Sequence, residues 1–368
     1  MASRSQPVRY AVVGLGHIAQ AAVLPAFRHA RRNSRLDALV SGDPAKLRIL
    51  SRRYGVARAC SYDEYDACLE DVDAVYIALP NSMHAEYTIR AARAGVHVLC
   101  EKPLGVTEEE CEQMIDACRR ANVKLMTAYR LHFEELNLDA IELVRLGRIG
   151  TPKFFNSSFS MTVRPGNIRT KRRLGGGTLY DIGIYCINAA RYLFRSEPTE
   201  VMALSVNSGA EALAEIDETT GAILRFGSEQ IATFVTSFNS SDVGSYRIVG
   251  TKGQLRVDPA YEYAEGLAYE LTVNGKTTRR RTGRRDQFAP ELAYFSDCIL
   301  RDRTPEPGGE EGLQDVRIVR ALYESAETGK AVPIPPYVAA KRPDARQTVR
   351  RPPVGRTSLV KARSGSVD

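Results

Sequence analysis

The stretch that decides the fold lies near the amino terminus and reads Val8-Arg9-Tyr10-Ala11-Val12-Val13-Gly14-Leu15-Gly16-His17-Ile18-Ala19. An apolar strand pattern runs directly into two glycines, and a helical pattern follows to about residue 30. Gly14 permits the tight turn after the strand, and Gly16 lets the backbone approach a pyrophosphate at a helix amino terminus. Ala19 stands where this fingerprint places a glycine or an alanine. The motif predicts a dinucleotide-binding domain.

The same alternation of strands and helices continues through the first third of the chain. Further apolar strand patterns lie near residues 36–41, 74–79, 97–100 and 124–128, with helical patterns between them. Strands separated by helices at this spacing indicate a doubly wound parallel sheet. We therefore predict an α/β protein whose amino-terminal Rossmann domain covers residues 7–128.

The pattern changes after Tyr129. Helical patterns near residues 133–146, 178–194, 288–301 and 312–328 surround long β-rich runs, with hairpin signals at residues 227–229 and 251–253. We predict an α+β domain over residues 129–335 with a mostly antiparallel, open sheet. Residues 336–368 form a basic segment that we expect to be disordered, because it is rich in proline, serine, arginine and lysine.

Composition excludes several classes of protein. The chain has 368 residues, of which 43% are hydrophobic and 26% charged, as in soluble globular proteins. No apolar run approaches a membrane span, and the first residues lack a signal-peptide core. The seven cysteines show no disulfide framework, so we expect a cytoplasmic protein. Most of the net charge of +7 lies in the final segment, which argues against a nucleic-acid-binding body.

A second stretch predicts a lysine at the ligand-binding end of the sheet and reads Val98-Leu99-Cys100-Glu101-Lys102-Pro103. Pro103 disfavours helix at Lys102, so the lysine is expected at the carboxyl end of a buried strand. Ligands of open parallel sheets bind at that end. A lysine there can hold a substrate hydroxyl or favour ionisation of a neighbouring acid. A solvated lysine that merely follows a strand is the alternative.

The end of the second predicted strand bears on the choice of nucleotide. Ser41 can donate to a 2′-phosphate and Lys46 can neutralise it, which favours NADP. Asp43 could instead bind the ribose diol of NAD, although it follows a glycine and precedes Pro44. We expect Asp43 to cap the following helix, and we keep NAD as the alternative cofactor.

In the second domain, a triple glycine precedes the residues best suited to proton transfer. All five histidines lie in the first 132 residues, so beyond His132, at its very beginning, this domain has no histidine base. It has Gly175-Gly176-Gly177-Thr178-Leu179-Tyr180-Asp181-Ile182-Gly183-Ile184-Tyr185, in which Thr178 suits a helix N-cap. Asp181 and Tyr185 are four residues apart and share one helix face. A nearby ammonium such as that of Lys102 would favour the phenolate and make tyrosine an effective acid–base group. Taken alone, Tyr185 could equally be a core residue of an amphipathic helix.

Together these motifs resemble the Gfo/Idh/MocA oxidoreductases, and within that family they look most like glucose–fructose oxidoreductase. The resemblance covers about residues 8–335. It rests on the glycine motif, Val40-Ser41-Gly42, Leu79-Pro80-Asn81-Ser82-Met83-His84, Glu101-Lys102-Pro103, Tyr129-Arg130, the triple glycine with its helix, and Gly309-Glu310-Glu311-Gly312-Leu313-Gln314-Asp315-Val316. Ile168-Arg169 is the nearest match to a Trp-Arg pair that often precedes the triple glycine in this family.

The resemblance implies a site, a cofactor and an assembly. It implies Lys102, Asp181 and Tyr185 as the catalytic residues, with Tyr185 as proton donor and acceptor, and it implies no metal. The residues it implies around the cofactor are Gly14, Gly16, His17, Ile18, Ser41, Lys46, Leu79, Asn81, His84, Glu101, Lys102, Arg130 and Arg169. It also implies a homodimer or homotetramer that pairs through the open sheet of the second domain.

The function that follows is that of an NADP-dependent oxidoreductase transferring hydride to or from an aldose or ketose. A cytoplasmic keto-sugar or anhydro-sugar reductase that uses free NADPH is the alternative of the same class. A catalytically silent NADP-binding sensor is the alternative of a different class. The presence of Lys102, Asp181 and Tyr185 together argues against a sensor, which has no need of them.

Overall fold

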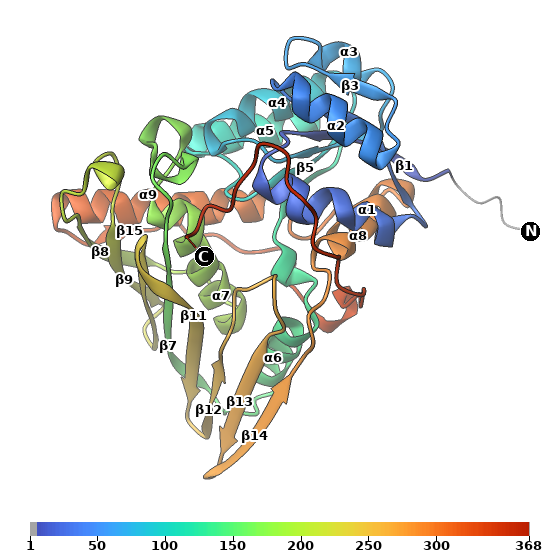
Figure 1. The fold of residues 1–368 in the computed structure, drawn as a ribbon. Coiled ribbons are helices and arrows are strands. Elements are labelled where there is room, and N and C mark those ends of the chain that lie inside the picture. The colour runs from blue at the N-terminus through green and yellow to red at the C-terminus, as the bar shows by residue number, and fades with distance from the viewer. Residues whose placement is uncertain (1–5, 368) are drawn as a thin grey trace, which may run out of the picture. The chain divides into compact units, whose positions relative to one another are not determined.

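The structure is a computed structural model that describes residues 6–367. The chain divides into two compact units (Figure 1). The first comprises the chain up to Arg130 together with residues 285–312 and 349–364, and the second comprises residues 131–284, 313–348 and the end of the chain from Gly365. Each unit is described by itself below.

The first unit contains a six-stranded parallel sheet in the order β3-β2-β1-β4-β5-β6. This is the strand order of a dinucleotide-binding fold, and it confirms the prediction of a Rossmann domain. The strands are β1 (Val8–Val13), β2 (Ser34–Val40), β3 (Arg58–Cys60), β4 (Ala74–Ile77), β5 (His97–Glu101) and β6 (Leu125–Ala128). The α-helices are α1 (Leu24–Ala30), α2 (Pro44–Tyr54), α3 (Tyr65–Leu69), α4 (His84–Arg93), α5 (Glu108–Arg120) and α8 (Phe288–Leu300), with the 3-10 turn η2 (Asn81–Met83). The 3-10 turn η3 (Arg130–His132) begins at the last residue of this segment and continues into the second unit.

The central strands are apolar because both faces of the sheet are buried. All four residues of β4 and all four of β6 are buried, as are five of the six residues of β1. A parallel sheet covered on both faces produces such continuous apolar runs rather than an alternating pattern. The chain reverses direction across the sheet between β1 and β4, and ligands of this fold bind beyond the carboxyl ends of the strands at that point.

The second unit is built on a nine-stranded sheet in the order β14-β13-β12-β11-β7-β10-β9-β8-β15. Its β7–β10 pairing is parallel, whereas the other ladders are antiparallel, so the predicted mostly antiparallel sheet is confirmed. The strands are β7 (Pro152–Thr162), β8 (Glu200–Val206), β9 (Thr219–Phe226), β10 (Gln230–Ser237), β11 (Asn239–Gly250), β12 (Gly253–Val257), β13 (Ala268–Val273), β14 (Lys276–Arg281) and β15 (Val332–Pro333). Both predicted hairpins occur, between β9 and β10 and between β11 and β12.

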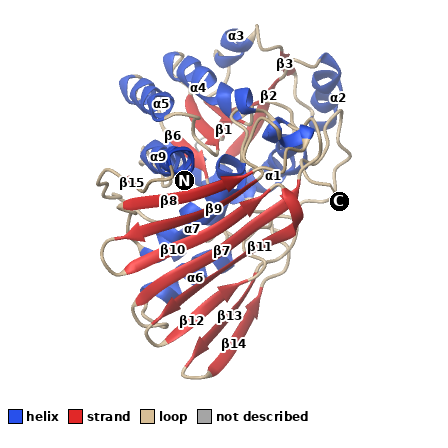
Figure 2. Ribbon diagram, turned by 90° about the vertical axis from the view of Figure 1, so that its left-hand side faces the viewer, coloured by secondary structure: helices blue, strands red, loops and turns tan. Residues whose placement is uncertain are grey.

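Helices cover one face of this sheet. Figure 2 views the sheet from its other face, with α6 (Glu135–Arg145) and α7 (Ile184–Phe194) behind the strands. The remaining elements are α9 (Gly309–Thr328), which crosses the boundary between the units, and the short turns η4 (Ile168–Thr170), η5 (Arg172–Leu174), η7 (Glu211–Leu213) and η8 (Ala345–Gln347). Strand residues therefore alternate between the core beneath the helices and the face turned toward the viewer.

Two helices begin with a π-helical turn where a regular α-helix was predicted. One is η1 (Ala19–Val23), which follows the glycine motif and leads into α1. The other is η6 (Leu179–Gly183), which follows the triple glycine and leads into α7. Single π turns inside α-helices occur frequently at functional sites. Both of these turns follow the glycine motifs on which the functional prediction rests.

The segment after residue 336 differs most from its prediction. Residues 349–364 cluster with the first unit, and Ser366 forms a β-bridge with Val163 at the end of β7 within the second unit. Its arginines, lysines and backbone groups form hydrogen bonds with distant parts of the chain, which composition alone does not reveal. The structure thus divides the chain differently from the predicted boundaries, because residues 285–312 and 349–364 return to the first unit.

No helix in the part of the chain that the structure describes is both long and apolar enough to cross a membrane.

Candidate active site

The glycine loop between β1 and η1 fits a dinucleotide. Gly14 has φ +92°, and a Cβ there would lie 2.5 Å from the carbonyl oxygen of Ala78, so only glycine is accommodated. A Cβ at Gly16 would meet no atom of the described residues within 4 Å, so this glycine faces open space. His17 and Ile18 begin the helical segment that follows. The first turn of a helix has N–H groups without intrahelical partners, and these suit a pyrophosphate.

The turn after β2 carries the residues predicted to select the nucleotide. Asp43 is the N-cap of α2: its Oδ1 accepts hydrogen bonds from the backbone N–H of Ala45 at 2.8 Å and of Lys46 at 3.2 Å. The expectation that Asp43 caps the helix is therefore confirmed. Ser41 directly follows β2, and its Oγ accepts a hydrogen bond from the backbone N–H of Asp43. Partial burial lowers the pKa of Lys46, and Asp43 opposes that shift.

The loops after β4 and β5 are joined by His84, the first residue of α4. Its Nδ1 lies 2.8 Å from the carbonyl oxygen of Pro103, and its Nε2 lies 3.0 Å from that of Leu79. The side chain is fully buried, and this burial lowers its pKa. His84 therefore holds two loops of the carboxyl edge together, and its contact with the cofactor, which the resemblance implied, stays a prediction. Leu79 and Asn81, also implied around the cofactor, lie on the first of these loops and at the start of η2.

Glu101 and Lys102 lie at the carboxyl end of β5, as predicted. The hydroxyl of Tyr76 donates to Glu101 Oε1 at 2.8 Å. Burial raises the pKa of Glu101, and the charge of Lys102 opposes this shift. Arg130, in the turn after β6, is buried and donates to the side-chain oxygen of Gln287. Charged groups thus gather at one edge of an otherwise apolar sheet.

Glu291 on α8 is a buried acid that the sequence did not single out. It is fully buried, and neither carboxyl oxygen has a hydrogen-bond partner among the described residues. Burial raises its pKa well above the ordinary 4.5, and the charge of Glu101 acts in the same direction. The folded protein therefore keeps a proton on Glu291 that the unfolded chain has released, so stability falls as pH rises from about 4.5 through the raised pKa.

We expect Glu291→Gln to flatten this fall in stability. The amide carries no charge at any pH, so the contribution of up to about 1.4 kcal/mol per pH unit disappears from the free energy of unfolding. Urea titrations at several pH values above about 4.5 measure the slope. Glu112→Gln is the matched control, because Glu112 is exposed. An unchanged slope in Glu291→Gln would show that Glu291 is ionised in the folded protein.

In the second unit, Asp181 and Tyr185 stand out from a buried helix. Every residue from Leu179 to Ala190 is buried except these two. The ring of Tyr185 packs against Phe159, with centroids 5.6 Å apart, and against Tyr261 at 5.9 Å. The helix thus presents an acid and a phenol outside its core, and aromatic neighbours hold the phenol ring in place.

Asp181 is held by Arg169, which lies in the loop before the triple glycine. Arg169 Nε donates to Asp181 Oδ2 at 2.5 Å. The side chain of Asp181 is only 15% exposed, so this ion pair is largely shielded from solvent. The guanidinium of Arg169 thus pairs with a predicted catalytic residue, and its place beside the cofactor, which the resemblance implied, stays a prediction.

The triple glycine permits close packing around a residue that sequence reasoning missed. A Cβ at Gly177 would lie 2.3 Å from the hydroxyl of Tyr323 and 2.8 Å from Asp217 Oδ1. Asp217 accepts hydrogen bonds from the backbone N–H and hydroxyl of Thr178 and from the hydroxyls of Thr220 and Tyr323. Thr178 occupies the N-cap position, as predicted, but its side chain makes no capping bond, and its backbone N–H donates instead to Asp217, from elsewhere in the chain. No local signal around Asp217 marks it.

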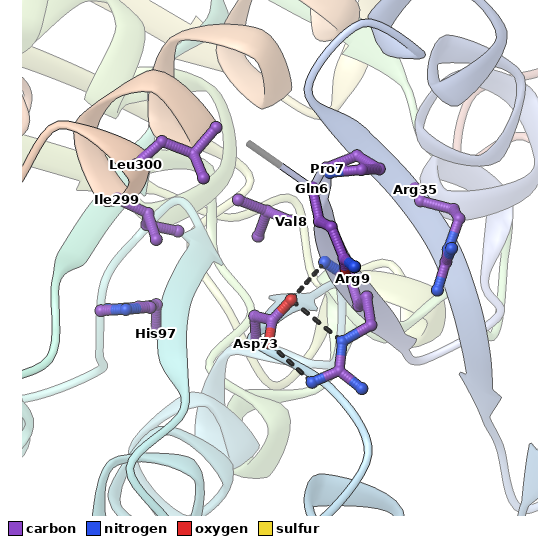
Figure 3. Close-up of a pocket in the computed structure, with 9 residues that line it drawn as sticks. All are labelled: Gln6, Pro7, Val8, Arg9, Arg35, Asp73, His97, Ile299 and Leu300. Atoms are coloured by element: carbon purple, nitrogen blue, oxygen red, sulfur yellow. Dashed lines mark hydrogen bonds and ion pairs between the residues drawn. The ribbon is translucent and has the colours of Figure 1, made fainter. Parts of the chain in front are cut away.

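One pocket lies at the opposite edge of the first unit's sheet. Figure 3 shows its lining, in which the backbone N–H and guanidinium of Arg9 bond to Asp73. Val8, Arg35, Asp73 and His97 lie at or just before the amino ends of their strands. Because ligands of open parallel sheets bind at the carboxyl ends, this pocket is not the cofactor site. Among residues 6–367, no group of three or more His, Cys, Asp or Glu side chains is arranged to hold a metal.

Family models match both parts of the chain, the amino-terminal domain and the domain that follows it. Residues 8–129 match the Gfo/Idh/MocA oxidoreductase family, NAD-binding Rossmann fold, and residues 138–256 match the Gfo/Idh/MocA C-terminal domain. The chain is 33% identical over 336 residues to D-xylose 1-dehydrogenase [NADP(+)] of Haloarcula marismortui, a match that covers 89% of this chain and 93% of that protein.

Solved structures share the fold over similar lengths. Aldose–aldose oxidoreductase from Caulobacter crescentus, complexed with glycerol, superposes with a TM-score of 0.85 at 38% identity, covering 89% of this chain and 100% of that one. A 3-ketoreductase from Actinomadura kijaniata, in complex with NADP and TDP-benzene, gives 0.80 at 26% identity, covering 87% and 98%. Further structures of that 3-ketoreductase carry a tyrosine-to-phenylalanine or a lysine-to-alanine substitution. On this sequence and structural similarity, the chain belongs to the Gfo/Idh/MocA oxidoreductase family.

Proposed function

We propose that this protein is an NADP-dependent oxidoreductase that transfers hydride to or from a sugar, as an aldose dehydrogenase or aldose oxidoreductase does. The observation that carries the proposal is the pair Asp181 and Tyr185, the two side chains left outside the core of a buried helix. The relatives named above, a D-xylose 1-dehydrogenase, an aldose–aldose oxidoreductase and a 3-ketoreductase, support the substrate class. Purified protein assayed with NADP and a panel of aldoses tests it.

The first unit would hold the cofactor. The glycine loop with Gly14 and Gly16 suits the pyrophosphate, and Ser41 and Lys46 suit the 2′-phosphate of the adenosine ribose. When bound, NADP supplies a nicotinamide that accepts or donates the hydride. Glu101 and Arg130, at the carboxyl ends of β5 and β6, shape that edge of the sheet.

We assign the proton chemistry to Tyr185, with Lys102 and Asp181 as its partners. Tyr185 takes the proton of the sugar hydroxyl as the carbon is oxidised, and it returns a proton when a carbonyl is reduced. Lys102 donates a hydrogen bond to that oxygen and stabilises negative charge on it. Asp181, held by Arg169, orients the sugar through its remaining acceptor sites. In the reductase direction the same residues would serve a keto-sugar or anhydro-sugar.

The preference for NADP over NAD gives a direct test of the turn after β2. A charge-assisted contact with the 2′-phosphate is worth roughly 1.5–3 kcal/mol, so we expect about tenfold to hundredfold tighter binding of NADP. Lys46→Ala should remove most of that preference and leave NAD binding unchanged. Arg48→Ala is the control, because Arg48 is an exposed cation on the same helix. Fluorescence titration with NADPH and NADH measures both affinities. Tighter binding of NADH than of NADPH by the wild type would contradict the NADP preference and would indicate that Asp43 binds the ribose diol of NAD.

We also propose that the protein is a homodimer or homotetramer formed through the open face of its nine-stranded sheet. Large apolar side chains are exposed there on neighbouring strands: Phe154, Met202, Leu204, Val206, Ile223, Ile231, Val235 and Val243. Such a patch on the face seen in Figure 2 is typical of a protein interface. A second copy of the chain is the partner that the resemblance implies.

Leu204→Glu should weaken this assembly. Leu204 is 67% exposed on β8, between the patch residues Met202 and Val206, and a carboxylate buried there without a partner should raise the dissociation constant at least about tenfold. Leu146→Glu is the matched control, because Leu146 is also exposed, at the end of α6. Sedimentation velocity over a range of concentrations reports both. A monomeric wild type, or equal dissociation in the control, would contradict the proposed interface.

A cytoplasmic location completes the proposal. All seven cysteines are buried and none forms a disulfide, as is typical of proteins in a reducing compartment.

A further inference from the structure

The segment 349–364, which we call the strap, crosses the first unit beside the proposed cofactor site. Arg351 Nε donates to the carbonyl oxygen of His29 near the end of α1, at 3.0 Å. Arg53 near the end of α2 donates to the carbonyl oxygen of Ser358 at 2.7 Å. Figure 1 shows this segment as the dark red trace running past α1 and α2. The strap therefore contacts α1, the helix that follows the glycine loop, and α2, the helix that follows β2.

Gln20 anchors the strap to the glycine loop. Its Oε1 accepts from the backbone N–H of Val360 at 2.7 Å, and its Nε2 donates to the carbonyl oxygen of Val360 at 3.0 Å. The same Nε2 donates to the carbonyl oxygen of Leu15, between the two glycines, at 2.8 Å. Gln20 is fully buried, so these bonds form away from solvent. One amide side chain thus fixes the strap against the loop that suits the pyrophosphate.

The next residue, Lys361, reaches the turn after β2. Its Nζ lies 3.2 Å from Asp43 Oδ2 and 3.4 Å from Oδ1. Lys361 has φ +45°, a left-handed backbone conformation that residues with a side chain seldom adopt. Strained backbone of this kind persists where the surrounding structure holds it and is concentrated at functional sites. Here the anchored neighbour Val360 holds the turn that brings the lysine to Asp43.

The charges at this turn favour an anion. Lys46 and Lys361 both interact with Asp43, and the charge of Lys361 contributes to lowering the pKa of Lys46, so the two ammonium groups are close enough to repel each other. Two lysines beside one carboxylate leave a net positive charge next to the hydroxyl of Ser41. A 2′-phosphate carries nearly two negative charges at neutral pH and would relieve this repulsion.

We propose that Lys361 is a specificity residue for the 2′-phosphate of NADP, delivered to the site by the strap from the far end of the chain. This inference rests on the proposed function, because it assumes that the turn after β2 receives the adenosine ribose. Lys361 would be a second cation at the 2′-phosphate, in addition to Lys46. The strap that carries it would cover the adenosine half of the cofactor site. The strap also gives the protein a means of slowing NADP release, since Lys361 must leave the phosphate before the nucleotide departs.

Binding measurements on the full-length protein test the assignment. Lys361→Ala should weaken NADPH binding about threefold to tenfold in a fluorescence titration and leave NADH binding unchanged, a modest effect because the side chain is 63% exposed. NADPH release in a stopped-flow experiment should accelerate by a similar factor. Arg356→Ala is the matched control, because it removes a positive charge from an exposed position of the same strap. Lys361→Arg should retain most of the affinity.

A double-mutant cycle separates direct contact from neutralisation of Asp43. If Lys361 contacts the phosphate, Lys361→Ala should weaken NADPH binding in an Asp43→Asn background as well. An effect that vanishes in that background would show that Lys361 only screens Asp43 and would overturn the assignment. An equal loss from Arg356→Ala would overturn it too, by reducing the effect to overall charge.

A chain that ends at Thr348 supplies the second variant. Without the strap, the preference for NADPH over NADH should fall at least as far as in Lys361→Ala; if this shorter chain does not fold, the point variants decide. Failure of the proposed function can be told apart from failure of this inference. If the wild-type protein binds neither NADPH nor NADH, the proposed cofactor site is wrong. A wild type that binds NADPH with an affinity unaffected by Lys361→Ala contradicts only the role of Lys361.

Discussion

Replacing Tyr185 by phenylalanine is expected to lower turnover about 100-fold or more while NADPH binding is retained. The substitution removes the hydroxyl that carries the proton and keeps the ring that packs against Phe159 and Tyr261. The loss should appear in kcat rather than in the affinity for the cofactor, because the hydroxyl acts on the reacting oxygen of the sugar. Steady-state rates with the best aldose, together with a fluorescence titration of NADPH, measure the two quantities separately.

Tyr246→Phe is the control for this experiment. Tyr246 is buried on β11 in the same unit, and its hydroxyl has no hydrogen-bond partner among the described residues, so its removal should change neither turnover nor stability appreciably. Near-normal turnover in Tyr185→Phe would remove Tyr185 from the reaction. Equal losses in both variants would show a general effect on the second unit rather than the loss of a proton carrier.

Lys102→Ala is the second substitution with a large expected effect. We expect a fall in kcat/KM of about 100-fold, because the ammonium that stabilises charge on the reacting oxygen is removed. The pH profile of activity should also move to higher pH, since a positive charge that favours the deprotonated hydroxyl is gone. Rates measured across a range of pH, with saturating NADP, give both results.

The control for Lys102 lies at the other edge of the same sheet. Lys124 precedes β6 and pairs with Asp302 at 2.6 Å, so Lys124→Ala removes an equal charge at the amino ends of the strands. Its activity should stay near that of the wild type. A reduced rate with an unchanged pH profile in Lys102→Ala would show that Lys102 positions the sugar without affecting its ionisation.

Local signals predicted the part of the site that depends on neighbouring residues. The glycine motif, the cap at Asp43 and the lysine at the end of β5 each depend on a few consecutive residues, and the structure has them where the sequence indicates. The two hairpins of the second unit were predictable for the same reason. Backbone turns and caps are set by local chemistry, so a single sequence carries them.

The features that were missed depend on residues far apart in the chain. Asp217 caps the helix that begins near Thr178, 39 positions away, and Gln20 holds Val360 across 340 positions. The strap has a composition typical of disorder, yet in the structure Gln20 and Arg53 form hydrogen bonds with its backbone. The burial of His84 could not be read from its position at a helix start, since it depends on the Pro103 loop folding over it.

Hydride transfer itself can be followed by the near-ultraviolet absorbance of reduced nicotinamide when the protein is mixed with NADP and a panel of aldoses. We expect a rise in absorbance that depends on the protein and the sugar, that is larger with NADP than with NAD, and that is at least about 100-fold slower with Tyr185→Phe. The same assay is run in reverse with NADPH and the corresponding lactones and keto-sugars. If the protein binds NADPH in a titration but the absorbance changes in neither direction, the proposed hydride transfer is contradicted. The protein would then be a nucleotide-binding protein without catalytic activity.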